Sequence, residues 1–246
     1  MRRFLAAVRF LTVLPLPGGE GAAGADLAGS VPYFPVVGIL LGAVAGASAW
    51  IAARAAVPPL LAGAAIVVLL VAFSGGMHMD GLSDTADGFL GARPREKVLE
   101  IMKDSRAGPM GVTAVACVLL VKFASVAALP QTRFPQAVFL MPLAGRCALV
   151  VHMALLPYVR KNGVGTIFEG NSTPLQGVRA ATIAGLAGWL ALGLPGLAAA
   201  GLCLAGSVAF AWWCHRRIGG ATGDTCGAAC EIVEAVPAAV LAVWPG

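Results

Sequence analysis

A long run without charge constrains this chain more than any other feature. No charged residue occurs in residues 180–214, and a Gly-Leu-Pro-Gly sequence at 193–196 divides the run near its middle. A transmembrane helix needs about 20 apolar residues, so this run predicts two consecutive helices, Ala180–Leu194 and Leu197–Trp213. Composition agrees, because charged residues make up only 12% of the chain, about half the share that is typical of soluble domains.

Further apolar stretches predict the remaining membrane helices. Four are long enough to span: Phe34–Ala53, Leu60–Ser74, Pro109–Leu129 and Ala137–Leu156. A seventh stretch, Val236–Trp244, is short, and we expect it to lie at the interface or to span incompletely. The chain is therefore predicted to be a single integral membrane domain, residues 1–246, with an all-α fold. That fold is a polytopic membrane helix bundle of about six to seven transmembrane helices.

The N-terminal residues predict a short amphipathic helix on the membrane surface. Arg9 interrupts the apolar core that a signal peptide would need. The residues expected on the buried side are Phe4, Leu5, Val8, Leu11 and Thr12.

The cations are distributed unevenly along this pattern. Thirteen of the 17 fall on one side of a six-span arrangement, which the positive-inside rule places in the cytoplasm. We therefore expect a multi-pass protein of the inner (cytoplasmic) membrane in contact with the lipid bilayer. Nucleic acid is not an expected partner, since no basic run is dense and only two Tyr could stack on bases. An oligomer is compatible with the sequence. The thirteen cations are Arg2, Arg3, Arg9, Arg93, Arg95, Lys97, Lys103, Arg106, Arg160, Lys161, Arg179, Arg216 and Arg217.

Three carboxylates follow the second predicted span at helical spacing. Asp80, Asp84 and Asp87 stand at i, i+4 and i+7, which places them on one face of a helix. Like charges so close to a membrane repel one another and are costly to desolvate, so a compensating cation is expected. Mg²⁺ prefers a few carboxylates together with water and substrate phosphates. His78 is a candidate ligand or base. The ordinary alternative is a solvated helix end.

A second acidic cluster follows the sixth predicted span. Asp224 and Glu231 are seven residues apart and share a helical face, so they are candidates to complete the metal site. The preceding Gly219 and Gly220 would let the backbone approach a phosphate. The ordinary alternative is a Gly-rich turn capped by Thr222 or Asp224.

Several charged residues are candidates to bind phosphate. Lys103, Asp104 and Arg106 lie between the second and third spans beside a glycine, which is also what an ordinary juxtamembrane loop looks like. Arg146 lies inside the fourth span, where an arginine is costly and usually faces a cavity or a partner. Carboxylates, Mg²⁺ and cations at a membrane face suit substitution at a diphosphate, with a carboxylate accepting the proton of an attacking alcohol.

Two other functions remain open at this stage. The order Asp84-x2-Asp87-Gly88 followed by Ala92-Arg93 resembles in part the metal motif of CDP-alcohol phosphotransferases of lipid synthesis. One extra residue precedes Ala92, however, and the G-x3-D-x3-D continuation is absent. An ion transporter is less favoured, because transporters place their charges near mid-membrane and often contain repeats.

A more specific resemblance covers most of the chain. The H-x-D-G-x2-D-x2-D-G element at 78–88 is specific. Four other pieces, two before it and two after it, occur in the order that the family shares. Together they resemble the cobalamin synthase family. The other pieces are Phe10-Leu11-Thr12-Val13-Leu14-Pro15, Phe34-Pro35-Val36-Val37-Gly38, Ile101-Met102-Lys103-Asp104-Ser105-Arg106-Ala107-Gly108 and Gly219-Gly220-Ala221-Thr222-Gly223-Asp224.

This resemblance implies an activity and a set of site residues. The activity is that of an adenosylcobinamide-GDP ribazoletransferase, a transferase acting on a diphosphate with Mg²⁺ as cofactor. The substrates implied are adenosylcobinamide-GDP and α-ribazole or its 5'-phosphate, and GMP is released in the last assembly step of vitamin B12 synthesis. The implied metal ligands are Asp80, Asp84, Asp87, Asp224 and Glu231, with Lys103, Arg106 and Arg146 on phosphate oxygens.

Overall fold

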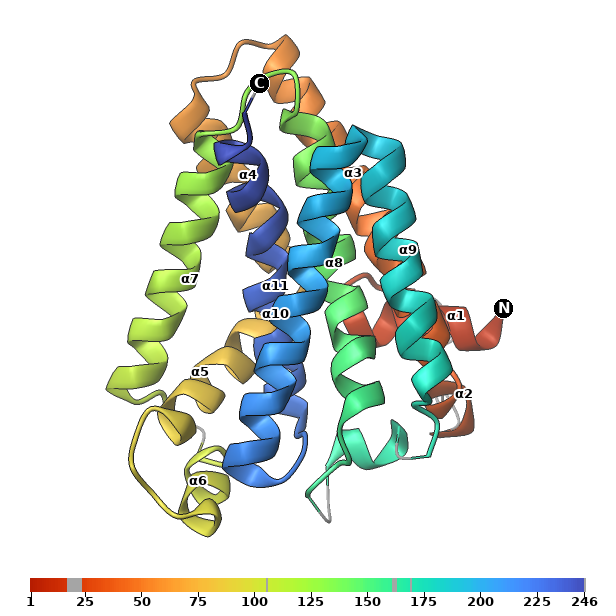
Figure 1. Cartoon of the computed structure of the whole chain (residues 1–246), viewed down its shortest axis with the longest axis vertical. Coiled ribbons are helices and arrows are strands. Elements are labelled where there is room, and N and C mark those ends of the chain that lie inside the picture. Colours follow the sequence, from red (N-terminus) through yellow and green to blue (C-terminus); the bar gives the residue numbers. More distant parts are fainter. Residues whose placement is uncertain (17–23, 105, 161–162, 169, 246) are drawn as a thin grey trace.

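Long helices stand side by side and form the body of the molecule (Figure 1). The computed structural model describes residues 1–16, 24–104, 106–160, 163–168 and 170–245. The predicted all-α bundle is confirmed. Its long helices are α3 (Phe34–Arg54), α4 (Pro59–Ser74), α7 (Pro109–Ala127), α8 (Phe134–Leu155), α9 (Pro174–Leu192), α10 (Leu194–Ile218) and α11 (Gly223–Val243).

Six of these helices are individually long and apolar enough to cross a membrane, namely all but α4. Helix α4 passes the same test only together with α5 (Met77–Phe89), from which it is bent by 90°. Gly75 and Gly76 make the bend with φ angles of +60° and +80°, a left-handed conformation that glycine adopts without a steric penalty. We treat α4 as the spanning part, while α5 turns away from it at one end of the bundle (Figure 1).

The seventh span differs from the sequence-based expectation. The stretch Val236–Trp244 is not a short interfacial segment but the end of α11, a 21-residue helix that starts at Gly223. Thr222 caps that start, since its hydroxyl accepts a hydrogen bond from the Thr225 amide. The prediction was wrong because acidic residues interrupt the apolar run, and these residues turn out to be inside the bundle.

Helix α8 forms the centre of the bundle, with α3 and α11 packed against it. The amphipathic helix α1 (Arg2–Leu11) lies crosswise to the long helices, next to the start of α3 (Figure 1). Its buried residues are Ala6, Ala7, Val8 and Leu11, followed by Thr12. Phe4 and Leu5 were also predicted to be buried but are only half-buried.

The short elements gather toward the same end of the bundle as α5 (Figure 1). Of the thirteen residues predicted to share one side, Lys161 lies outside the described residues. The other twelve lie in α1, in or beside α6, after α8, in the first turns of α9 or at the end of α10, which are the parts of the chain near that end. Arg54 and Arg133 lie at the opposite end, where α3 and α8 respectively end and begin. The remaining short elements are α2 (Gly24–Ala28), η1 (Val31–Tyr33), α6 (Arg95–Ile101) and η2 (Val164–Phe168).

Candidate functional site

A close approach of α5 and α11 brings the two acidic clusters together. A Cβ atom on Gly81 would lie 2.8 Å from the carbonyl oxygen of Asp224, so only glycine lets the two backbones come this near. Asp80 and Asp84, on either side of Gly81 along α5, thereby come to lie near Asp224. Burial, Asp224 and Asp80 together raise the pKa of Asp84 to about 7, against an opposing effect of Arg160.

Backbone pairing holds Asp224 at the start of α11. The Val159 amide donates to the Ala221 carbonyl at 3.0 Å, and the Ala221 amide donates to the Pro157 carbonyl at 2.8 Å. This pairing sets Arg160 beside Asp224, with Arg160 Nη2 2.5 Å from Asp224 Oδ2.

Arg160 is a site residue that the sequence did not identify. Its Nη2 also donates to the Met102 carbonyl at 3.0 Å, so it joins the segment after α8 to the segment after α6. In the sequence it counted only as one of the positive-inside cations, and its neighbours carry no motif. Only the pairing of two distant segments distinguishes it.

Asp87 binds the start of α7. The Gly108 amide donates to Asp87 Oδ2 at 2.7 Å and the Gly111 amide donates to Asp87 Oδ1 at 2.9 Å. A Cβ atom on Gly111 would collide with Ser83 Oγ, which explains the glycine at this position. Asp87 therefore latches Gly108 and the start of α7 to α5 through charge-assisted hydrogen bonds.

The predicted phosphate-binding loop lies at this end of the molecule and is exposed. Arg106 Nη2 is 2.7 Å from Asp104 Oδ2, and the Arg106 side chain is 86% exposed. Hydrogen bonds from Arg106 lower the pKa of Asp104 to about 2. Lys103 is exposed as well, while Ser105 lies outside the described residues. Lys103 and Arg106 are thus available to an anionic ligand, with Asp104 orienting Arg106.

Glu231 and Arg146 lie elsewhere, in an ion network buried between α7, α8 and α11. Lys122 Nζ is 2.5 Å from Glu231 Oε2 and 2.8 Å from Glu234 Oε1, and Arg146 pairs with the other oxygen of Glu234. All four side chains are at most 4% exposed. The structure therefore brings neither Glu231 nor Arg146 to the aspartates, and these two residues neutralise charge within the bundle.

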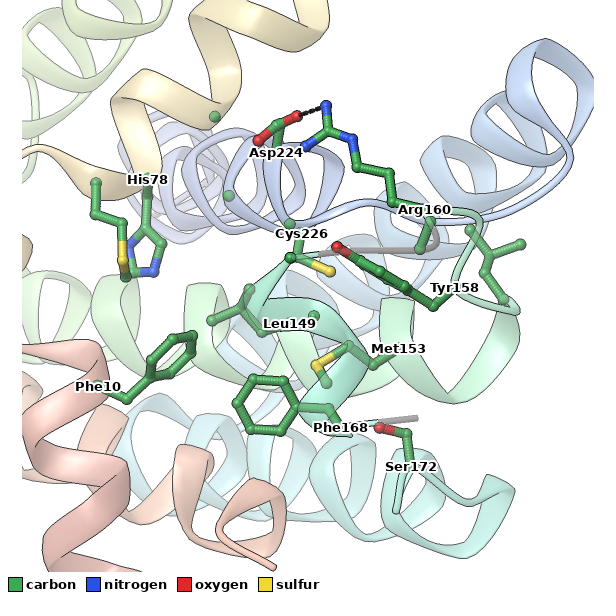
Figure 2. Close-up of a pocket in the computed structure, with 18 of the residues that line it drawn as sticks. Phe10, His78, Leu149, Met153, Tyr158, Arg160, Phe168, Ser172, Asp224 and Cys226 are labelled. Atoms are coloured by element: carbon green, nitrogen blue, oxygen red, sulfur yellow. Dashed lines mark hydrogen bonds and ion pairs between the residues drawn. The ribbon is translucent and has the colours of Figure 1, made fainter. Parts of the chain in front are cut away.

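A cavity of about 540 Å³ opens beside the acid cluster (Figure 2). Asp80, Arg160 and Asp224 line it, and so does His78 from the first turn of α5. His78 Nδ1 is 3.7 Å from Cys230 Sγ. His78 Nε2 is buried without a hydrogen-bond partner among the described residues.

The aspartates suit a magnesium ion that is partly coordinated by substrate. Among the described residues, no three His, Cys, Asp or Glu side chains are arranged to hold a metal by themselves. Mg²⁺ commonly takes one or two carboxylates and completes its octahedron with water and phosphate oxygens. Burial raises the pKa of Asp84, and the nearby Asp224 and Asp80 raise it further; a bound cation would offset that repulsion, so the donor set fits such an ion.

The fold and the site define a multi-pass membrane protein with an acidic site and a cavity at one end of its helix bundle. Comparison with known proteins identifies it further. The model of the Cobalamin-5-phosphate synthase family matches residues 3–242, and the chain belongs to this family. No solved structure matches the chain significantly.

Curated relatives cover nearly the whole chain. A protein of Stutzerimonas stutzeri is 39% identical over 252 residues, covering 100% of each chain. A protein of Roseiflexus sp. is 40% identical over 96% of this chain and 87% of its own. One of Geotalea daltonii is 33% identical over 95% and 94%. Each is named adenosylcobinamide-GDP ribazoletransferase. These relatives favour a function in cobalamin synthesis over the two alternatives, a phosphotransferase of lipid synthesis and an ion transporter.

Proposed function

We propose that this chain transfers α-ribazole, or its 5'-phosphate, to adenosylcobinamide-GDP and releases GMP. The observation that carries the proposal is the meeting of Asp80, Asp84 and Asp224 beside a cavity that Asp80 and Asp224 line. The exposed cations Lys103 and Arg106 lie at the same end of the bundle. The names of the curated relatives supply the substrates.

The reaction is a substitution at the phosphorus nearer the corrinoid. The ribazole hydroxyl oxygen forms a new bond to that phosphorus, while the bond to the GMP oxygen breaks and GMP takes the electron pair. Lys103 and Arg106 bind the diphosphate oxygens and neutralise charge on the leaving group. Asp87 keeps their loop in place through the hydrogen bonds to Gly108 and Gly111.

Asp84 suits the role of proton acceptor for the attacking hydroxyl. A general base works best when its pKa is near the working pH, and burial, Asp224 and Asp80 raise the pKa of Asp84 to about 7 before a metal binds. Asp80 and Asp224, with Asp84 beside them, would hold Mg²⁺, which when bound supplies a positive charge that stabilises the transferring diphosphate. Arg160 orients the Asp224 carboxylate.

We further propose that the site faces the cytoplasm across the inner membrane. The cations gather at the end of the bundle that carries the site, as the positive-inside rule requires of a cytoplasmic end. A cysteine introduced at Arg106 should react with an impermeant maleimide only in inverted vesicles. One introduced at Arg133 should react only in intact cells. The opposite labelling pattern would reverse the orientation.

The activity is tested with membranes that contain the protein, adenosylcobinamide-GDP, α-ribazole and Mg²⁺. Wild-type membranes should release GMP and form cobalamin, and Asp84→Asn should lower the rate at least about 100-fold, the usual contribution of a general base. Asp26→Asn, the same change on α2, serves as the control and should retain activity. Absence of product with wild-type membranes would overturn the function, and full activity of Asp84→Asn would overturn the role of Asp84.

A further inference from the structure

The cavity beside the acid cluster has an apolar part built from residues of four separate segments. Phe10 of α1, Phe34 of α3 and Phe168 of η2 pack against one another, with ring centroids 5.2 to 5.9 Å apart. Leu149 and Met153 of α8 complete this part of the wall (Figure 2). A concave wall of aromatic and aliphatic side chains is typical of a site for a flat apolar group.

The opposite part of the wall is polar. Arg160, Tyr158 and Asp224 lie together on the far side from Phe10 and Phe168 (Figure 2). The cavity thus changes from apolar to charged along its length, and the charged part belongs to the acid cluster where the substitution is proposed to occur. A ligand that fits has a flat apolar group at one end and a reacting hydroxyl at the other.

On the basis of the proposed function, we infer that this cavity is the acceptor site. It holds the benzimidazole base of α-ribazole against Phe10, Phe34 and Phe168, with the ribose directed to Asp224. The volume of about 540 Å³ lies within the range of sites for small ligands and accommodates a nucleoside. The corrin ring is several times larger than a nucleoside and carries amides around its edge. An apolar wall would leave these amides without hydrogen-bond partners. The corrinoid therefore stays outside the cavity.

Two polar atoms on the wall support the presence of a ligand. His78 Nε2 and Ser172 Oγ are buried without a hydrogen-bond partner in the described part of the chain, and both residues line the cavity. Buried polar atoms without partners are costly. When the Cys230 thiol donates to His78 Nδ1, the Nε2–H is left to donate to the free ring nitrogen of a benzimidazole. This assigns His78 to binding the acceptor, in place of the catalytic role that the sequence indicated.

The test separates the two substrates by their KM values. Met153→Trp fills the cavity and Phe168→Ala removes one aromatic wall. Each should raise the KM for α-ribazole at least about tenfold, the equivalent of about 1.4 kcal/mol, while the KM for adenosylcobinamide-GDP stays unchanged. Phe134→Ala removes an equally buried ring at the opposite end of the bundle and should change neither KM. His78→Ala should raise the KM for α-ribazole as well.

Binding of α-ribazole to the purified full-length protein in lipid nanodiscs, measured by equilibrium dialysis, tests the inference without turnover. The wild type should bind and Met153→Trp should not, while thermal unfolding confirms that the variant is folded. An unchanged α-ribazole KM in both cavity variants, with wild-type activity intact, would overturn the acceptor site and leave the proposed function standing. A rise in the KM for adenosylcobinamide-GDP instead would place the donor in the cavity.

Discussion

The latch between Asp87 and the start of α7 makes a prediction about local stability. Asp87 accepts one hydrogen bond at each carboxylate oxygen, from Gly108 and from Gly111. Asparagine keeps only one of these oxygens. The amide nitrogen that replaces the other oxygen is itself a donor. In Asp87→Asn the side-chain NH2 therefore faces the backbone N–H of either Gly108 or Gly111, and that hydrogen bond is lost.

The magnitude follows from the number of bonds lost. A hydrogen bond to a charged group contributes about 1.5–3 kcal/mol, and Asp87 is half-buried, so water recovers part of the loss. We expect Asp87→Asn to cost about 1.5 kcal/mol. Because about 1.4 kcal/mol is a factor of ten, the state in which Gly108 and Gly111 are detached from α5 should become about tenfold more populated.

Amide hydrogen exchange of the detergent-solubilised protein measures this opening directly. In Asp87→Asn, exchange at Gly108 and Gly111 should be about tenfold faster, since the exchange rate follows the population of the open state. Asp80→Asn is the matched control, being the same change on the same helix at an exposed residue. Unchanged exchange in Asp87→Asn, or equal acceleration in the control, would refute the latch.

Two further predictions concern charge. Glu234→Gln should lower the free energy of unfolding by about 3 kcal/mol because it leaves Arg146 buried without a counter-ion. The control Glu96→Gln, on exposed α6, should change the free energy of unfolding by less than about 0.5 kcal/mol. Thermal unfolding in detergent measures both variants. Activity at limiting Mg²⁺ should rise as the pH passes about 7, because Asp84 must lose its proton to act as a base. Arg160→Met should move that inflection to higher pH because Arg160 lowers the pKa of Asp84, and a profile that is flat through neutral pH would contradict the role of Asp84.

The helix bundle could be predicted from the sequence because long apolar segments directly indicate helices that lie in lipid. The spacing of Asp80, Asp84 and Asp87 likewise predicted one helical face, and α5 carries all three. Shared spacing did not predict shared partners. Asp87 binds the backbone of α7, while Asp84 lies near Asp224, because the packing of other elements on α5 decides what each carboxylate meets. That packing depends on Gly81 and Gly111. In a sequence, a glycine indicates only that another segment can approach closely, and it does not indicate which segment does so.

Glu231 shows where the reasoning from spacing failed. Seven residues separate it from Asp224 along α11, which at 1.5 Å per residue is about 10 Å of depth. A carboxylate at that depth requires a cation, and Lys122 of α7 meets the requirement. The same cost argument indicated a cavity or a partner for Arg146, and the partner is Glu234 of the same chain, not the substrate phosphate to which the resemblance assigned this arginine. Applied to Glu231 and Glu234, it would have predicted a spanning helix whose two buried acids are neutralised by Lys122 and Arg146. The apolar run was interrupted by acids that lie inside the bundle, so their pairing, and not their hydropathy, shows that they belong to the seventh helix, which begins where Thr222 caps it.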